Sequence, residues 1–251
     1  HTGPGTCRQG QGSQIAETFR VLREHLKKHE DVELSFDGVV TVPKHELDQL
    51  SEQAKVLGCQ PSLNYYNKKA TVSVKNPSTY RKRSAGGHIH IGSLDRLLTV
   101  KDMSQPHGLT KERLVPLLDI LLGNQSVLLD RDPRAAERRK HYGRAGEYRL
   151  PSYGLEYRTL SNFWLRSYPL MSFVMGLARQ AVYILGTTLY HKVPRSQPEM
   201  VYYKDYFDAE QALLDSVHLP TVVKAINSND VDLAWKNWEG VKEFVSAHVP
   251  L

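Results

Sequence analysis

The segment from Gly86 to Gly92, Gly-Gly-His-Ile-His-Ile-Gly, constrains the fold of this chain more than any other. Its β-branched residues alternate with histidines, and the side chains of a β-strand alternate between the two faces of a sheet. The pattern therefore predicts a strand in which Ile89 and Ile91 enter a core. His88 and His90 would lie together on the opposite face, and the flanking glycines let another backbone or a ligand come close.

Two imidazoles on one strand face can both bind a metal ion, or one can bind a metal while the other contacts a phosphate. The alternative is that both histidines are partly exposed polar residues of a sheet. A catalytic zinc site needs a third protein ligand. The sequence has neither a His-Glu-x-x-His motif nor a cysteine-rich segment that would supply one.

Strand and helix patterns are mixed along the chain without a regular β–α–β alternation. This mixture indicates an α+β fold with a largely antiparallel sheet and a helical C-terminal part. We expect an α+β domain over residues 1–190 and a helical extension packed on it over 191–251. The expected helices are 13–26, 43–57, 114–129, 132–143, 170–189, 209–217 and 231–245, and the further strands are 32–36, 40–42, 70–74, 147–150 and 155–160.

Composition limits the class of protein. The 251 residues carry 33 Lys and Arg against 27 Asp and Glu, a net charge of +6, which suggests an anionic partner such as a nucleotide, a polyphosphate or a nucleic acid. Two cysteines cannot build a disulfide framework, which favours a reducing compartment. The longest apolar stretch, 171–190, contains Arg179 and Gln180, so a buried helix explains it better than a membrane span.

A basic segment follows the expected helix 114–129. Between Arg131 and Arg149 it has seven Arg or Lys residues and three acids. Guanidinium groups can hold phosphate or carboxylate oxygens through two parallel hydrogen bonds. The alternative is a solvated basic helix.

Glu156 and Arg158 lie two residues apart on an expected strand and hence share one face. They form either a simple salt bridge of the sheet, which contributes little if it is exposed, or a metal ligand beside a phosphate-binding group. Arg149, on the neighbouring strand, could add a second phosphate contact.

Three segments occur in a fixed order: GGHIHIG at 86–92, RRKHYGRAGEYR at 138–149 and YGLEYRTLSNFW at 153–164. Together they resemble the phage-type carboxylate–amine ligases called COOH-NH2 ligase type 2, relatives of glutamine synthetase and glutamate–cysteine ligase. The resemblance covers about residues 6–164. It implies a curved antiparallel sheet with helices outside it, as in the catalytic domain of glutamine synthetase, with ATP and two or three divalent metals in the concave mouth.

The resemblance also implies roles for individual residues. His88 and Glu156 would bind a metal. His90 would bind the nucleotide phosphates, with Arg139 and Arg144 as further nucleotide-binding candidates. Arg149 and Arg158 would stabilise the transferred phosphoryl group.

The activity that the resemblance implies is ATP-dependent amide-bond formation through an acyl phosphate. Mg²⁺ or Mn²⁺ would be the ion, and a small carboxylate and an amine would be the substrates. We expect a protein of the cytoplasm of an infected bacterium, with no membrane partner, as a homo-oligomer or a virion-associated component of a phage particle.

In this family, acidic metal ligands precede the stretch that resembles Thr6-Cys7-Arg8. Glu33 and Asp37 are the nearby acids on a plausible strand, and no motif places them in that role. We therefore expect this chain to lack the first strands and to hold only part of the metal site. This departure leaves open an inactive structural protein with a ligase fold.

A third class of function is a nucleic-acid-binding module. Aromatic and basic residues alternate in 65–69 and 80–83, as they do in proteins that bind single strands. The alternative for both segments is a solvated loop.

Overall fold

The structure is a computed structural model that describes residues 2–5, 7–29, 32, 34–55, 61–71, 79–94, 111–191 and 209–248. Parts of the predicted elements, namely Glu33, the helix end at 56–57 and the strand end at 72–74, lie outside the described residues.

The described part of the chain is α+β, as the sequence predicts. The helices are α1 (Arg8–Leu26), α2 (Lys44–Gln49), α3 (Glu52–Lys55), α5 (Leu114–Leu118), α6 (Asn124–Leu129), α7 (Ala135–His141), α8 (Tyr168–His191), α9 (Ala209–Asp215), α10 (Leu219–Ser228) and α11 (Val231–His248), with short turns η1 (Lys111–Arg113), η2 (Asp119–Gly123) and η3 (Asn162–Arg166). The strands are β1 (Val39–Thr41), β2 (Ser62–Asn64), β3 (Ala70–Thr71), β4 (Lys82–Ser84), β5 (Ile89–Gly92), β6 (Glu147–Arg149) and β7 (Gly154–Tyr157).

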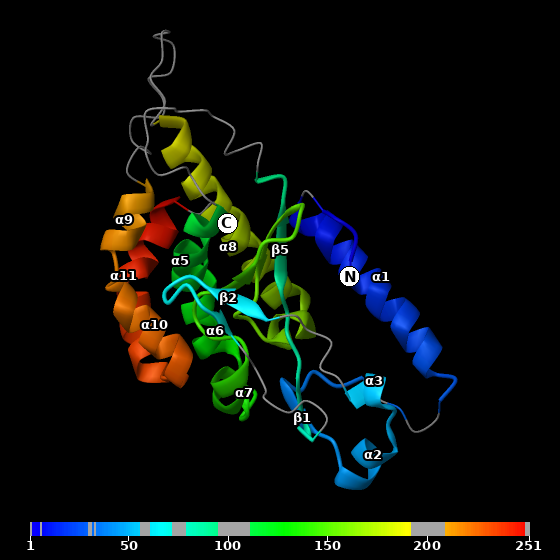
Figure 1. Cartoon of the computed structure of the whole chain (residues 1–251). Helices are drawn as coiled ribbons and strands as arrows, with labels where there is room; N and C mark the ends of the chain where they lie inside the picture. The colour runs from blue at the N-terminus through cyan, green and yellow to red at the C-terminus, as the bar shows by residue number, and fades with distance from the viewer. Residues whose placement is uncertain are drawn as a thin grey trace.

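The main sheet has five strands in the order β3-β2-β6-β7-β5, and every pairing in it is antiparallel. Its apolar face carries Tyr148, Leu155, Tyr157 and Ile89, which are buried in the same core as α5, η2 and α8. The two-stranded sheet of β1 and β4 is separate. The C-terminal helices, orange to red, and α1, blue, lie on opposite sides of the molecule (Figure 1).

The helical C-terminal part shares this core. Leu213, Val222, Ile226 and Ala234 are fully buried and belong to the cluster that contains the sheet residues. The packing agrees with the predicted helical part, while the boundary at residue 190 stays a prediction.

Polar side chains also join the C-terminal helices to α6. The amide of Asn124 donates to the Ala234 carbonyl at 3.0 Å, and the amide of Asn237 donates to Asn124 Oδ1 at 3.0 Å. The Thr221 hydroxyl donates to Asn237 Oδ1 at 2.7 Å. This chain of hydrogen bonds links α10, α11 and α6.

The first helix begins earlier than the sequence pattern predicts. Cys7 is its N-cap, and the Cys7 sulfur accepts a hydrogen bond from the Gly10 amide at 3.3 Å. Ser13, the first residue of the predicted helix, lies inside α1, where its hydroxyl donates to the Gln9 carbonyl at 3.1 Å. The predicted helix start at residue 13 is therefore wrong, because a sulfur atom satisfies the end of the helix at Cys7 in place of a hydroxyl.

Two other predicted elements differ in their extent. The segment 34–36, expected to be part of a strand, is not one, and the next strand, Val39–Thr41, pairs with Lys82–Ser84. The helix expected over 114–129 is continuous, but Asp119–Gly123 forms a π-helical turn in which the Asn124 amide donates to the Asp119 carbonyl.

Helix α8 is long and apolar enough to cross a membrane by length and composition alone, over Tyr168–Gly186. It packs against α1, α5 and α9, and 44% of this window is buried within the protein. These contacts are typical of a core helix.

Candidate metal centre

The polar face of the main sheet carries the residues that the sequence singles out. Glu156 lies on β7 between its two neighbouring strands. It pairs with His90 of β5 on one side and with Arg149 of β6 on the other. His88 comes directly before β5 and Arg158 directly after β7, on the same side. The predicted alternation of faces is confirmed, because Ile89 is buried in the core while its two histidine neighbours meet Glu156.

Glu156 is the centre of this group. Its Oε1 lies 2.8 Å from His88 Nδ1 and 3.3 Å from Arg158 Nε. Arg149 makes two hydrogen bonds to the carboxylate, from Nε to Oε2 at 2.7 Å and from Nη2 to Oε1 at 2.8 Å. Burial by itself raises the pKa of Glu156, but the hydrogen bonds from His88 and Arg149 and the Arg158 charge outweigh it and lower the pKa to about 2. The carboxylate is therefore ionised at neutral pH.

Burial lowers the pKa of both histidines, although Glu156 opposes the shift. Both imidazoles are consequently neutral at pH 7, the form that binds metals. Each also contacts a tyrosine: His88 Nε2 lies 2.5 Å from the Tyr142 hydroxyl, and His90 Nδ1 contacts the Tyr153 hydroxyl.

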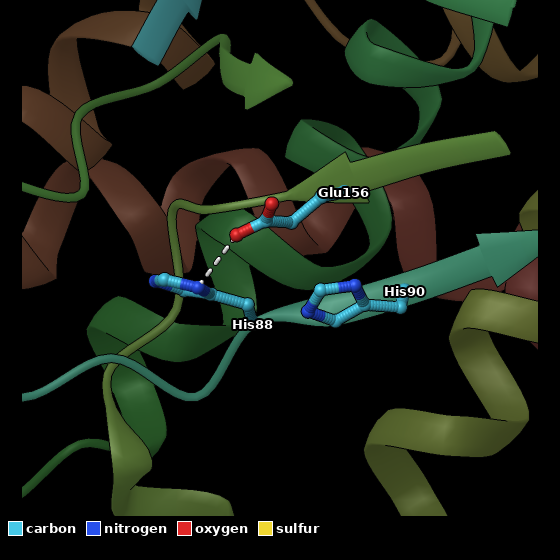
Figure 2. Close-up of side chains that lie close together, drawn as sticks. All are labelled: His88, His90 and Glu156. Carbon is cyan, nitrogen blue, oxygen red and sulfur yellow. Dashed lines mark ion pairs between the residues drawn. The ribbon is translucent and has the colours of Figure 1, made fainter. Parts of the chain in front are cut away.

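One donor atom from each of His88, His90 and Glu156 lies within 4.8 Å of the other two. Figure 2 shows the His88 ring paired with the Glu156 carboxylate and the His90 ring extending from its strand towards His88. Two neutral nitrogens and an ionised oxygen form a donor set that fits a divalent cation. The residues present thus fit the metal that the sequence predicts, through His90 as well as through His88 and Glu156.

The segment before His88 is held by close backbone packing. The Trp164 indole donates to the Gly87 carbonyl at 3.1 Å. A Cβ atom at Gly87 would lie 2.3 Å from the Ser161 carbonyl oxygen and 2.3 Å from Trp164 Nε1. Only glycine fits this contact, which fixes where the histidine strand begins.

Arg138 of α7 holds the same region from the other side. Its buried guanidinium donates to the carbonyls of Ala85 at 2.8 Å, Thr159 at 2.9 Å and Leu160 at 2.7 Å. These carbonyls come just before His88 and just after Arg158. Strand β7 ends at Tyr157, earlier than the predicted 160, where these side-chain hydrogen bonds replace strand pairing.

The two arginines that resemblance assigns to the phosphoryl group differ in exposure. The side chain of Arg149 is 31% exposed, whereas that of Arg158 is 0% exposed. Arg158 also donates to Ser62 Oγ at 2.9 Å and to the Tyr142 hydroxyl at 2.8 Å. Arg149 is therefore partly accessible to solvent beside Glu156, while Arg158 is built into the protein interior.

The structure does not bring Arg139 or Arg144 to the three candidate metal ligands. Arg139 is buried and donates to Ser126 Oγ at 2.8 Å, to Asn229 Oδ1 at 3.1 Å and to the Gly143 carbonyl at 3.2 Å. Arg144 is exposed, and its guanidinium donates to the carbonyls of Arg139 and Lys140 in the last turn of α7. Arg144 thus stabilises the end of this helix, whereas Arg139 links the helix to α6 and to the residue that follows α10.

Three residues of this group were not singled out from the sequence: Tyr142, Tyr153 and Ser62. The two tyrosines occur inside the motifs that carry the resemblance, each beside a glycine or a turn. A tyrosine hydroxyl in such a motif is a signal that could have been used. Ser62 has no comparable signal, because its position depends on the pairing of β2 with β6.

The aromatic and basic segments that suggest nucleic-acid binding are used within the protein. Tyr66 donates its hydroxyl to Asp119 Oδ2 at 2.7 Å, and Lys68 lies over the Tyr65 ring. Arg81 donates to the Val42 carbonyl at 2.9 Å, and Lys82 pairs with Glu137. These contacts do not favour a binding platform for single strands.

Two acids outside this group, Asp119 and Asp37, have their own partners. Asp119, in the π-helical turn, accepts hydrogen bonds from the hydroxyls of Tyr66 at 2.7 Å and Tyr157 at 2.6 Å. Burial raises the pKa of Asp119 to about 6, although these hydrogen bonds lower it. Asp37, one of the two acids near a plausible early strand, pairs with Arg134 at 2.7 Å, so it is not brought to the candidate metal ligands.

The fold and the site define the class: an α+β protein with an antiparallel sheet whose polar face gathers imidazole, carboxylate and guanidinium groups at a candidate metal centre. The sequence model of the phage phiEco32-like COOH.NH2 ligase-type 2 family matches residues 60–234, and the chain belongs to this family. The family name indicates a carboxylate–amine ligase. No curated protein and no solved structure gives a significant match to this chain.

Proposed function

We propose that the protein joins a carboxylate to an amine at the expense of ATP, through an acyl phosphate. The observation that carries this proposal is the meeting of His88, His90 and Glu156 with Arg149 on one sheet face, in a chain of a carboxylate–amine ligase family. Phosphoryl transfer requires positive charge beside the transferred group, and a metal-ligand set next to a partly exposed guanidinium can supply it.

In the first step, a carboxylate oxygen of the substrate attacks the γ-phosphorus of ATP, and the bond to the ADP oxygen breaks. In the second, the amine nitrogen attacks the acyl carbon, phosphate leaves, and the nitrogen loses a proton. His88, His90 and Glu156 would hold a divalent cation, which supplies charge neutralisation for the phosphate oxygens. Arg149 would place a second positive charge on the transferred group.

Arg158 has a different part in this proposal. Because its side chain is fully buried and bonded to Ser62 and Tyr142, it acts as a positioning residue that holds Glu156 ionised and in place. The proposal therefore separates the two arginines: Arg149 contacts the phosphoryl group, and Arg158 supports the ligand set.

The donor set also bears on the metal. Mg²⁺ prefers oxygen ligands, whereas Mn²⁺ accepts carboxylate and imidazole together more readily. We propose that Mn²⁺ binds more tightly than Mg²⁺ at this centre, with the remaining positions taken by water or phosphate oxygens. The substrates are a small carboxylate and an amine.

Hydroxylamine provides a test that needs no knowledge of the natural amine, because it converts acyl phosphates to hydroxamates. The protein is incubated with ATP, Mn²⁺ or Mg²⁺, hydroxylamine and a panel of carboxylates. The proposal predicts carboxylate-dependent release of ADP together with a hydroxamate, and loss of both in Glu156→Gln. Glu239→Gln, on the exposed face of α11, is the matched control and should keep activity.

Two results would contradict the proposal. One is normal turnover in Glu156→Gln. The other is a wild-type protein that binds neither Mn²⁺ nor ATP, which would favour the structural protein with a ligase fold.

A further inference from the structure

Each histidine of the candidate metal centre is held by a tyrosine hydroxyl, and the two are held through different ring nitrogens. His88 directs Nδ1 to Glu156 Oε1 at 2.8 Å and Nε2 to the Tyr142 hydroxyl at 2.5 Å. His90 is reversed, because its Nδ1 contacts the Tyr153 hydroxyl. Figure 2 shows the other ring nitrogen of His90 directed towards His88.

A neutral imidazole carries a single proton, so the nitrogen that binds a metal must be the one without it. The second nitrogen then carries the proton and needs an acceptor, and outer partners of this kind fix the tautomer of metal-binding histidines. A hydroxyl can accept such a proton. Tyr142 and Tyr153 stand where those acceptors are needed.

We propose that Tyr142 and Tyr153 are positioning residues that make the two histidines bind the cation through opposite nitrogens, His88 through Nδ1 and His90 through Nε2. The inference rests on the metal centre of the proposed function and adds the outer contacts that define its geometry. It concerns the residues of this chain and not the reaction.

The Tyr142 hydroxyl can both donate and accept a hydrogen bond, and the proposed tautomer of His88 requires each of these at a different time. Without a metal, His88 Nδ1 carries the proton that it donates to the Glu156 carboxylate, and Tyr142 donates its hydroxyl proton to Nε2. When a cation takes the place between Nδ1 and Glu156, Nδ1 loses its proton and Nε2 gains one. The imidazole stays neutral, and the Tyr142 hydroxyl turns from donor to acceptor while still accepting from Arg158 Nη2 at 2.8 Å.

The test uses Zn²⁺ as a diamagnetic probe, with two readouts that do not depend on turnover. Calorimetry measures Zn²⁺ affinity, and long-range ¹H–¹⁵N spectra of histidine-labelled protein report which ring nitrogen carries the proton. In the wild-type protein, His88 should change from Nδ1–H to Nε2–H on adding Zn²⁺, while His90 keeps Nδ1–H.

Tyr142→Phe and Tyr153→Phe should each weaken Zn²⁺ binding by about 10- to 100-fold. Each should disturb the proton pattern of its own histidine and leave that of the other intact. Tyr168→Phe, an exposed tyrosine of α8, is the control and should bind as the wild type does.

The outcomes separate the two proposals. A wild-type protein that does not bind Zn²⁺ overturns the metal centre and this inference with it. Binding with both histidines attached through Nε2 overturns the inference and leaves the centre standing. The inference is also overturned, with the centre left standing, if both phenylalanine variants keep the wild-type Zn²⁺ affinity and the wild-type histidine spectrum.

Discussion

Arg149 and Glu156 lie directly opposite each other on β6 and β7 and are joined by two hydrogen bonds of 2.7 and 2.8 Å. The same carboxylate faces His88 and His90 on its other side. The Glu156 carboxylate thus lies between the Arg149 guanidinium and the histidines of the candidate metal centre.

Under the proposed function, Arg149→Ala should lower ligase turnover by roughly two to three orders of magnitude, because it would remove a positive charge beside the transferred phosphoryl group. Its stability should change little, since the side chain is partly exposed and Glu156 keeps its contacts with His88 and Arg158. Steady-state kinetics and urea unfolding, compared on the same preparation, measure both effects.

Arg158→Ala should instead destabilise the protein by about 3–5 kcal/mol, because it breaks a buried ion pair and empties the space of a fully buried side chain. Urea unfolding provides the measurement. If Arg149→Ala and Arg158→Ala lose the same stability, the distinction between a contacting and a positioning arginine is wrong.

Gly87→Ala should cost about 1–3 kcal/mol of stability, because the added Cβ meets the backbone of Ser161 at 2.3 Å. It should also weaken Mn²⁺ binding, since the next residue is His88. Gly92→Ala, at the other end of the same segment, is the matched control, as its Cβ would lie 3.7 Å from the nearest atom outside its neighbours. Equal thermal unfolding of the two variants would contradict this account of Gly87.

Asp119 should make stability depend on pH. Its pKa is about 6 in the folded protein against 3.8 as its ordinary value, so the folded state binds the proton more tightly. This contribution is fully present below the unfolded pKa and is lost as the pH rises through about 6. Relative to Asp119→Asn, the wild type should gain about 2 kcal/mol of unfolding free energy between pH 7.5 and pH 4.5.

The comparison of wild type with Asp119→Asn by urea unfolding at both pH values removes the contributions of other titrating groups. A stability difference between the two proteins that does not change with pH would show that Asp119 is ionised in the folded state at both pH values.

Asn237→Ala should destabilise the protein by about 1–3 kcal/mol, because it leaves the buried Asn124 Oδ1 and the half-buried Thr221 hydroxyl without this partner. The exposed Lys236→Ala on the same helix is the control and should be nearly neutral. Fluorescence and circular dichroism should report one common transition for both parts of the chain. Separate transitions would place the C-terminal helices outside the cooperative unit.

The sequence predicted the composition of the polar sheet face because alternation along a strand is a local rule. The period of two along a strand was enough to predict that His88 and His90 share one face. The same rule predicted that Glu156 and Arg158 share a face of their own strand. The resemblance anticipated that the two pairs meet, but their meeting depends on the pairing of β5 with β7, which neither the resemblance nor the alternation specified. Tyr142 reaches His88 from a turn after α7, and no local pattern specifies such a contact.

The basic segment shows a limit of another kind. Sequence offered two interpretations for it, a phosphate-binding set or a solvated helix, but Arg138 and Arg139 follow neither. Both are buried and bound to carbonyl or side-chain oxygens of the protein. Which basic residues turn inward depends on where unpaired carbonyls end up, and this is decided by the tertiary fold.

The carbonyl contacts of Arg138 have a consequence for any survey of tolerated substitutions. Lysine, a single ammonium on a flexible stem, cannot reproduce the planar fork that serves three acceptors from two segments. Position 138 should consequently tolerate replacement as poorly as the candidate metal ligands, although its guanidinium contacts backbone carbonyls of the protein and no ligand. A survey of substitutions would therefore group Arg138 with the candidate metal ligands. Metal-binding measurements on folded variants would distinguish a position needed for folding from a position needed for binding.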